Sequence, residues 1–287
     1  MRFGILFTNT GRAVLPEGAT ALASIAEENG FESLWTVEHV VVPAGYESAY
    51  PYSPTGKMPG AEESPIPDPL IWLTWVAATT RTIKLATGIL ILPQRNPAVL
   101  AKEVATLDLL SGGRVILGVG VGWLKEEFEA LGIPFEQRGA RTDEYIEALR
   151  VFWREAEPTY KGKFVDFTNA KSYPKPAQTG GVPIAIGGHT EAAARRAGRL
   201  GDEFFPGTAG AEQLAGLLDV MRKAAIDAGR DPDSIVVTAG GAFDPDGVKR
   251  LADLGVHRVV IPNLGGDPER WKQSLGAFAE NVISKVS

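Results

Sequence analysis

The chain of 287 residues has no cysteine and only three histidines. Without cysteine it has no disulfide bond, no thiolate nucleophile, no iron–sulfur cluster and no zinc site built on thiolates. Metal ligation is left to histidine and carboxylate side chains, and no group of these has the spacing of a metal site. We therefore expect no resident metal.

Long basic runs and long apolar runs are missing as well. The net charge is -6 and no stretch of five or more lysines and arginines occurs, so we expect no nucleic-acid partner. No window approaches the roughly 18 apolar residues of a membrane span, and the start MRFGILFTNTG lacks a signal-peptide pattern. We expect no membrane partner and a cytoplasmic location.

What the chain does contain is a regular alternation of short β-branched or aromatic runs with amphipathic stretches. This pattern is typical of a parallel sheet with crossover helices, and eight units in a chain of this length favour a (β/α)₈ TIM barrel. We expect one domain over residues 1–287, without a second domain. The predicted strands are residues 2–7, 33–37, 84–90, 114–119, 183–187, 203–205, 235–239 and 258–262.

Helices are predicted between the strands, for example over residues 17–29, closed by Gly30, and over residues 97–110. Asn96 is a candidate N-cap of the second of these, and Pro97 suits its first position. Two insertions interrupt the rhythm: residues 40–68 after strand two and residues 160–181 before strand five. The first, rich in Pro, Gly and Tyr, is either an ordered cover over the barrel mouth or a packed surface loop without a functional role.

The carboxyl ends of the predicted strands, where barrel enzymes keep their chemistry, hold many glycines and few ionisable groups. No lysine is available there for a Schiff base. Such a mouth indicates an enzyme that borrows its chemistry from a cofactor.

Strand four carries glycine at alternate positions, in RVILGVGVGW (residues 114–123). Gly118, Gly120 and Gly122 fall on one strand face, and the missing side chains would let a flat ring approach the backbone. The same glycines could instead fill the taper of the barrel opposite large neighbours. Trp123 stands where a dinucleotide-binding fingerprint would need another glycine.

The segment GGHT (residues 187–190) joins strand five to an alanine-rich helix for which Thr190 is a candidate N-cap. Free amides at a helix start favour an anion, and glycines let a phosphate approach closely. Glu191, in the first turn, would partly cancel that attraction. A phosphate site and a simple capped turn both remain open.

His39 lies beside Glu38 at the end of strand two. A histidine at this place is either a structural residue or an acid–base group that contacts a cofactor ring. Glu38 could orient it or cap the strand, although adjacent strand residues point to opposite faces. We expect the acidic doublets Glu62–Glu63 and Glu126–Glu127 to be solvated.

These segments together resemble the bacterial luciferase-like superfamily, in particular its coenzyme F420-dependent oxidoreductase branch. The likeness is carried by GFESLWTVEHVVVP (residues 30–43), by the long stretch from TGILILPQRNP to GARTDEY (residues 87–145) and by PIAIGGHTEAAARRAGRLGDEFFP (residues 183–206). It implies a (β/α)₈ barrel, a homodimer, and F420 or a flavin such as FMN bound at the mouth.

The resemblance also assigns roles. His39 and Glu38 match the acid–base pair after strand two, and Gly88–Ile89 matches a non-prolyl cis peptide that bulges against the cofactor ring. The floor of the site and the phosphate turn follow strands four and five. The residues expected to bind the cofactor are Thr87, Gly88, Ile89, Gly120, Gly122, Trp123, Gly187, Gly188, His189 and Thr190.

Two departures from the family pattern bear on function. Val121 stands where luciferases have a phosphate-contacting arginine, which weakens the FMN hypothesis. Trp123 stands where sugar-phosphate dehydrogenases of the F420 branch have a catalytic glutamate, which disfavours a glucose phosphate as substrate. Trp35, Trp123 and the Tyr46–Tyr52 region are candidates for an apolar substrate wall.

The first hypothesis is an F420-dependent oxidoreductase that moves a hydride between the deazaflavin and a small organic substrate, with His39 handling the proton. The second is a two-component monooxygenase that uses reduced FMN from a separate reductase. The third is a non-catalytic protein that binds flavin or deazaflavin.

Overall fold

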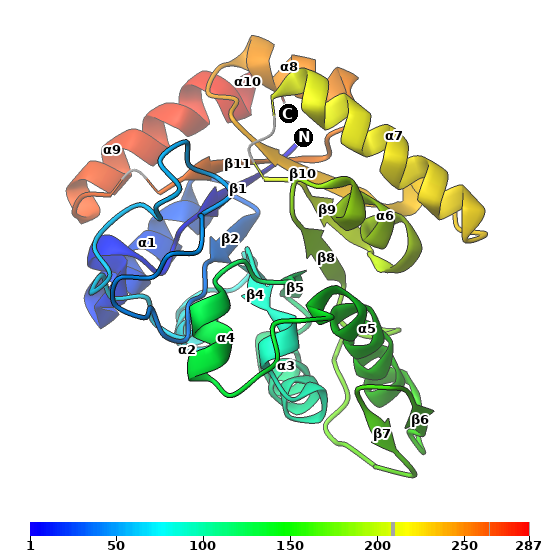
Figure 1. Cartoon of the computed structure of the whole chain (residues 1–287). Coiled ribbons are helices and arrows are strands. Elements are labelled where there is room, and N and C mark those ends of the chain that lie inside the picture. Colours follow the sequence, from blue (N-terminus) through cyan, green and yellow to red (C-terminus); the bar gives the residue numbers. More distant parts are fainter. Residues whose placement is uncertain (208–209, 264, 287) are drawn as a thin grey trace.

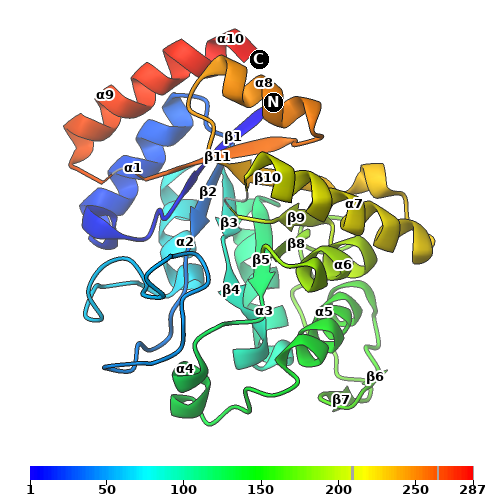
Figure 2. The same cartoon turned by 45° about the horizontal axis from the view of Figure 1, so that its top comes forward.

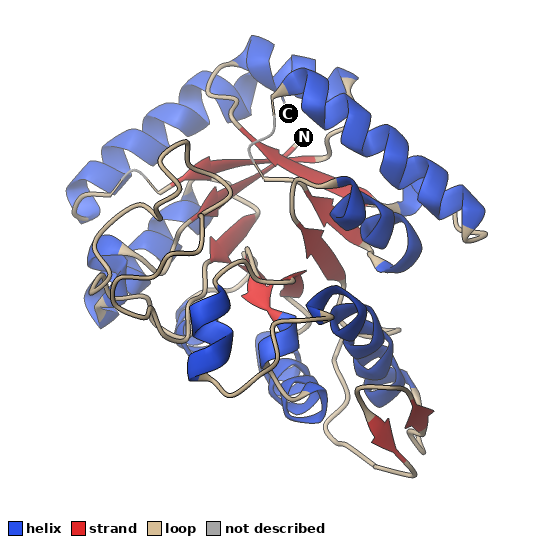
Figure 3. Ribbon diagram, viewed as in Figure 1, coloured by secondary structure: helices blue, strands red, loops and turns tan. Residues whose placement is uncertain are grey.

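A computed structural model describes residues 1–207, 210–263 and 265–286. Its strands form a closed parallel barrel inside a ring of helices, as predicted (Figures 1 and 3). β1 lies between β2 and β11, and pairing of β3 with β5 closes the ring. The barrel strands are β1 (Arg2–Leu6), β2 (Ser33–Thr36), β3 (Lys84–Thr87) with its continuation β4 (Leu90–Ile91), β5 (Val115–Gly120), β8 (Ile184–Gly187), β9 (Glu203–Phe205), β10 (Val236–Gly240) and β11 (Arg258–Pro262).

The helices begin and end where local sequence signals place them. The Asn96 side chain accepts the amides of Ala98 and Val99, and left-handed Gly112 closes the same helix, as its missing Cβ allows. The helices are α1 (Pro16–Glu28), α2 (Pro69–Thr79), α3 (Pro97–Ser111), α4 (Lys125–Ala130), α5 (Arg138–Arg154), α6 (Glu191–Leu200), α7 (Ala211–Asp227), α8 (Pro245–Asp253), α9 (Pro268–Phe278) and α10 (Ser284–Val286). None of the described helices is long and apolar enough to cross a bilayer.

The barrel interior is filled by buried side chains from most of its strands, among them Leu6, Trp35, Ala86, Ile116, Ala185, Phe205 and Val260. Trp35 is completely buried there, in T-shaped contact with Phe205 at 5.3 Å between ring centroids, and its indole nitrogen donates to the Ser33 hydroxyl. The expectation that Trp35 lines a substrate wall is therefore wrong, because its ring belongs to the core. Below it, buried Arg258 pairs with Glu203 and Glu32 at the amino end of the barrel.

The predicted third strand is broken in two. The peptide bond between Gly88 and Ile89 is cis, as the resemblance implied, and these two residues leave the sheet between β3 and β4. β3 pairs with β2 and β5, whereas β4 pairs with β5 alone. The break lies at the carboxyl end of the barrel, so the displaced backbone faces the mouth.

The two insertions lie in different places. Residues 160–181 contain a short hairpin, β6 (Tyr160–Lys161) with β7 (Asp166–Phe167), which packs on the outside of α5 through a stacked contact of Phe167 with Phe152 (Figure 1). Residues 40–68, here called the mouth loop, have neither helix nor strand and lie near α4 at the carboxyl end of the strands (Figure 2).

Candidate functional site

The carboxyl ends of β2, β3, β5 and β8 bring the predicted site residues to one end of the barrel. His39 follows β2, Gly88 and Ile89 separate β3 from β4, Trp123 follows β5, and the turn of residues 187–190 follows β8. The sequence segments expected to form a site are thus neighbours in space.

The strand-four glycines make room for the protein itself. A Cβ on Gly120 would lie 2.6 Å from Cδ1 of Ile89, and a Cβ on Gly187 would lie 2.4 Å from its Cγ2. A Cβ on Gly118 would lie 1.8 Å from the carbonyl oxygen of Thr87. A Cβ on Gly122 would lie 2.7 Å from Phe128 and 2.8 Å from Ile91. The side-chain space that these glycines leave is thus filled by the protein itself, and their contact with a cofactor stays a prediction.

Ile89 therefore forms a platform. Its side chain is seated between Gly120 and Gly187, and the residue is only partly buried. The glycines therefore have an indirect role. They leave room for the Ile89 side chain and its backbone close to the strand ends.

His39 is paired with a carboxylate, but not with its sequence neighbour. Its Nδ1 lies 3.1 Å from Oε2 of Glu127, whose side chain is fully buried. The second oxygen of Glu127 accepts the amides of Val40 and Val41, at 2.7 Å and 3.3 Å. The expectation that Glu126 and Glu127 form a solvated face is wrong for Glu127, since α4 directs this carboxylate under the mouth loop.

Glu38 points into a different network. Its carboxylate accepts hydrogen bonds from the Ile91 amide and from the guanidinium of Arg95, which also donates to Asp68 at 2.8 Å. Burial raises the pKa of Glu38, against the opposing pull of the Arg95 charge. Because Glu38 precedes the mouth loop and Asp68 ends it, Arg95 joins both ends of the loop.

Two further contacts hold the mouth loop. The amide nitrogen of the Asn9 side chain donates to the carbonyls of Val37 and Pro67, at 2.8 Å and 3.0 Å. Oε1 of Glu126 accepts the amides of Glu47 and Ser48. Hydrogen bonds from Ser48 and Glu47 lower the pKa of Glu126 to about 2. Both members of the doublet Glu126–Glu127 thus fasten the mouth loop to α4.

Of the doublet Glu62–Glu63, only Glu63 has the solvated position that we expect from the sequence. Glu62 accepts the Gly45 amide with both carboxylate oxygens, at 3.0 Å and 3.1 Å, and so holds the mouth loop to itself. Glu63 is exposed, as predicted.

Aromatic rings form a continuous row across the mouth. Trp123 makes T-shaped contacts with His39, Tyr46 and Tyr50, at centroid distances of 5.8 Å, 5.5 Å and 5.2 Å. Tyr50 contacts Tyr52. The predicted grouping of Trp123 with the Tyr46–Tyr52 region is thus present, and it places an apolar wall beside His39.

The row of rings ends on the β8–α6 turn, residues 187–190, where Tyr52 contacts His189. In that turn the Thr190 side chain accepts the Ala193 amide, so the predicted N-cap is confirmed. Gly188 has φ +126°, a conformation that other residues rarely adopt. The Glu191 carboxylate forms an ion pair with Arg195 at 2.8 Å, so its negative charge at the start of the helix is partly neutralised.

Oε2 of Glu126, in α4, is buried without a partner among the described residues. The same holds for polar atoms at three strand ends: Thr8 Oγ1, both side-chain amide atoms of Gln94, and His189 Nδ1. They follow β1, β4 and β8, so all lie at the carboxyl end of the barrel. Buried polar atoms are nearly always satisfied, and leaving one bare costs about 1–3 kcal/mol. A polar ligand in the mouth would supply the partners.

Sequence reasoning missed Gln94, Glu127 and Arg95. Gln94 stands three residues after the end of β4, in LPQRNP, and its place just beyond the third strand is the signal for it. The pairing of His39 with Glu127 spans 88 positions, and no local pattern indicates it.

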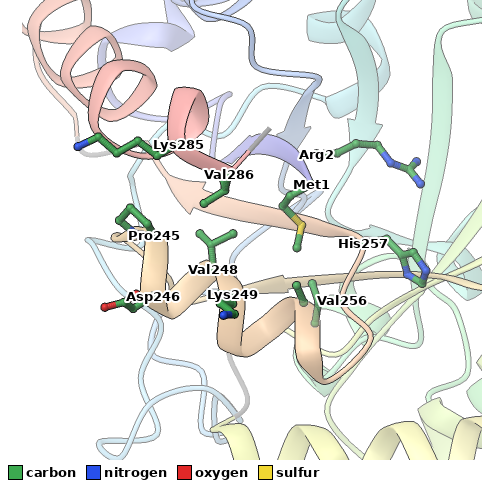
Figure 4. Close-up of a pocket in the computed structure, with 11 residues that line it drawn as sticks. Met1, Arg2, Pro245, Asp246, Val248, Lys249, Val256, His257, Lys285 and Val286 are labelled. Carbon is green, nitrogen blue, oxygen red and sulfur yellow. The ribbon is translucent and has the colours of Figure 1, made fainter.

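A separate groove of about 720 Å³ lies away from the mouth (Figure 4). It runs between α8, the C-terminal helix α10 and the start of β1, where Val248, Lys249, Lys285 and Met1 line it. None of the predicted site residues reaches it, so the candidate site remains the barrel mouth.

The comparison with protein families decides the relationship. The family model described as luciferase-like monooxygenase matches residues 1–243. The chain belongs to this luciferase-like family. It is accordingly an oxidoreductase. The last barrel strand, β11, lies beyond the matched range.

Among relatives of this luciferase-like protein, an uncharacterized protein of Mycobacterium tuberculosis, Rv0940c, is 35% identical over 274 residues, covering 92% of this chain and 94% of the relative. The F420-dependent glucose-6-phosphate dehydrogenase of Kineococcus radiotolerans is 34% identical over 184 residues, covering 63% of this chain and 49% of that enzyme.

Solved structures agree on the fold. The monooxygenase RslO1 from Streptomyces bottropensis superposes with a TM-score of 0.79 at 25% identity, covering 100% of both chains. An F420-dependent secondary alcohol dehydrogenase in complex with an F420–acetone adduct superposes with a TM-score of 0.81 at 19% identity, covering 100% of this chain and 99% of that one. The second likeness concerns the fold alone.

Proposed function

We propose that this luciferase-like protein is an F420-dependent oxidoreductase that transfers a hydride between the deazaflavin and a small uncharged substrate. The observation that carries the proposal is the arrangement around Ile89. A partly exposed apolar platform lies between Gly120 and Gly187, with His39 at one side of the mouth and the start of α6 at the other. This arrangement suits a flat ring with an anionic tail.

The residues present fit such a group. The first amides of α6, at Glu191 and Ala192, have no intrahelical acceptor, and Gly188 lets an anion come close to them. The unpartnered polar atoms of Thr8, Gln94 and His189 offer further hydrogen bonds. Thr87, Gly88 and Ile89 would support the ring, and Gly187 to Thr190 would hold the phosphate.

F420, when bound, supplies or accepts a hydride at its C5 atom. The chain's own part is to orient the reactants, exclude water and move a proton. His39 is the candidate for the proton, because imidazole can donate or accept near neutral pH and its Nε2 has no partner among the described residues. The aromatic row and the mouth loop would shield the reacting atoms from solvent.

The wall of the mouth favours an uncharged, apolar substrate. Trp123 and Tyr50 present rings beside His39, and apolar side chains are exposed on Val40, Val41 and Phe243, which follow β2 and β10. Trp123 stands where the resemblance gives the sugar-phosphate dehydrogenases a catalytic glutamate. Enones, imines and secondary alcohols are the substrate classes to test first.

A second candidate, a monooxygenase using reduced FMN, is favoured by the match to RslO1, a monooxygenase that this chain covers fully at 25% identity. The same mouth could hold FMN, since its ring and phosphate have a similar shape. Val121, where luciferases carry a phosphate-contacting arginine, weighs against this candidate.

The test is a turnover assay with purified protein. Reduced F420 is mixed with cyclohexenone, and oxidised F420 with isopropanol, while deazaflavin absorbance and dissolved oxygen are followed. We expect turnover without oxygen uptake, and loss of turnover in His39→Asn with cofactor binding retained. Oxygen uptake that requires reduced FMN would instead establish the monooxygenase.

A further inference from the structure

Glu127 is an unusual carboxylate in this chain. It is fully buried, yet no lysine or arginine among the described residues pairs with it. Its partners are Nδ1 of His39 and the amides of Val40 and Val41. Burying a carboxylate is costly, so each of these hydrogen bonds has to be made in the folded chain.

The pairing determines which nitrogen of His39 carries the proton in the neutral ring. A carboxylate accepts hydrogen bonds and cannot donate, so Nδ1 at 3.1 Å must present its hydrogen to Oε2 of Glu127. Nε2 is then the nitrogen with a free lone pair. Trp123 makes a T-shaped contact with the same ring, with the centroids 5.8 Å apart, and this contact restricts rotation of the imidazole.

We propose that Glu127 is the positioning residue of His39: it fixes the Nδ1–H tautomer and keeps Nε2 available for the reacting proton. Glu38, the neighbouring carboxylate, has no such role, because its oxygens are taken by Arg95 and the Ile91 amide. The catalytic part of this inference rests on the proposed function, whereas the tautomer is a property of the protein alone.

Glu127 also couples the histidine to the mouth loop. Oε2 of Glu127 contacts the His39 ring and Oε1 accepts the amides of Val40 and Val41, the first residues of the mouth loop. The position of the ring is therefore fixed relative to the start of the loop. Replacing one oxygen by an NH₂ group removes an acceptor from one of these contacts. The loop start and the ring should therefore loosen together in Glu127→Gln.

The chain has only three histidines, which allows a direct measurement of the tautomer. Long-range ¹H–¹⁵N correlation spectra at pH 8, above the ordinary titration range of imidazole, distinguish Nδ1–H from Nε2–H. His257 is an internal reference, because its Nδ1 accepts the Val237 amide at 3.0 Å and its proton must be on Nε2. His39→Asn identifies the His39 signals by their disappearance.

We expect the wild-type His39 to be the Nδ1–H tautomer, opposite to His257. In folded Glu127→Gln, this single tautomer should be lost and kcat should fall about 100-fold, within the contribution of general acid–base catalysis, while KM changes little. Glu127→Asp, which keeps the carboxylate, should recover part of kcat. The matched control is Glu129→Gln on the same helix, since the Glu129 side chain is 60% exposed and, among the described residues, forms an ion pair with Lys125 alone.

An Nε2–H tautomer in the wild-type protein would overturn the proposal, even if Glu127→Gln failed to fold. An unchanged tautomer and kcat in folded Glu127→Gln would overturn it too. If His39 has the expected tautomer but no substrate is turned over, the proposed function fails and the positioning by Glu127 stands.

Discussion

Tyr52 and His189 lie in T-shaped contact, with ring centroids 4.6 Å apart. The first belongs to the mouth loop and the second to the β8–α6 turn, so this contact bridges two sides of the barrel mouth. With the row through Tyr50 and Trp123, it makes the mouth loop an ordered cover, which is one of the two interpretations that the sequence left open.

Removing the Tyr52 ring should weaken cofactor binding. An aromatic pair contributes about 0.5–1.5 kcal/mol, so Tyr52→Ala is expected to raise the Kd for F420 by about 2–10-fold. Tyr52→Phe keeps the ring and should bind nearly as the wild type does. Fluorescence titration of each variant measures the effect, and equal affinities in all three proteins would contradict a role for this contact.

The strand-four glycines should differ in what an added methyl group does. In Gly118→Ala the Cβ meets the Thr87 carbonyl, which is backbone and cannot move cheaply, so unfolding free energy should fall by about 3 kcal/mol or more. In Gly120→Ala it meets the end of the Ile89 side chain, which can shift. A smaller loss of stability, with weaker cofactor binding, is expected there.

Gly216→Ala in α7 is the control for this series, because no atom of the described residues outside the helix's own backbone lies within 4 Å of its Cβ position. It should stabilise the protein by about 0.5–1 kcal/mol, through helix propensity alone. Urea unfolding compares the three variants. A stable Gly118→Ala protein would show that the Thr87 carbonyl does not lie against this strand.

Glu27 should make the stability depend on acid pH. Burial opposes its ionisation, but hydrogen bonds from Thr82, Ile83 and Arg81 prevail and lower its pKa from 4.5 to about 2. A lowered pKa stabilises the fold fully above the ordinary value, and this contribution is lost as pH falls toward 2. The difference in unfolding free energy between wild type and Glu27→Gln should therefore be constant above pH 5 and shrink below pH 4.5.

Glu28→Gln is the neighbouring control, since Glu28 is exposed. A substitution at such an exposed position should stay within about 0.5 kcal/mol of the wild type. A Glu27→Gln difference that grew toward low pH would have the wrong sign and would refute the assignment.

Arg258 should be important for stability. It is 1% exposed and bonds Glu203, Glu32 and Thr238 at the amino end of the barrel. Removing one partner of a buried ion pair leaves an uncompensated charge, so Arg258→Ala should cost about 3–5 kcal/mol. Exposed Arg250→Ala should stay within about 0.5 kcal/mol of the wild type. Thermal or urea unfolding distinguishes the two, and equal losses would contradict the account.

Much of the fold could be predicted from the sequence, because a parallel barrel repeats one local pattern. Each predicted strand is a short apolar run, and the caps at Asn96 and Thr190 are local signals that the structure confirms. The break at Gly88 could not be derived from periodicity, since residues 84–90 read as one continuous strand. Only the family resemblance indicated it.

The candidate site was predicted less completely, since its contacts join distant segments. Glu38 is next to His39 in sequence, but the strand directs its carboxylate to Arg95, whereas Glu127 arrives from α4. Residue type makes Trp35 a candidate for the substrate wall, whereas its strand position puts its ring in the barrel core. The homodimer and the cytoplasmic location stay predictions.

The most direct test of the central claim is a fluorescence titration of the purified chain with F420 and with FMN, each oxidised and reduced. The account predicts that F420 binds with low-micromolar or tighter Kd and that FMN binds at least about tenfold more weakly, a difference of 1.4 kcal/mol. Preference for FMN would contradict the account and point to the oxygen-using alternative. Failure to bind either would mean that Ile89 and its glycines serve barrel packing alone.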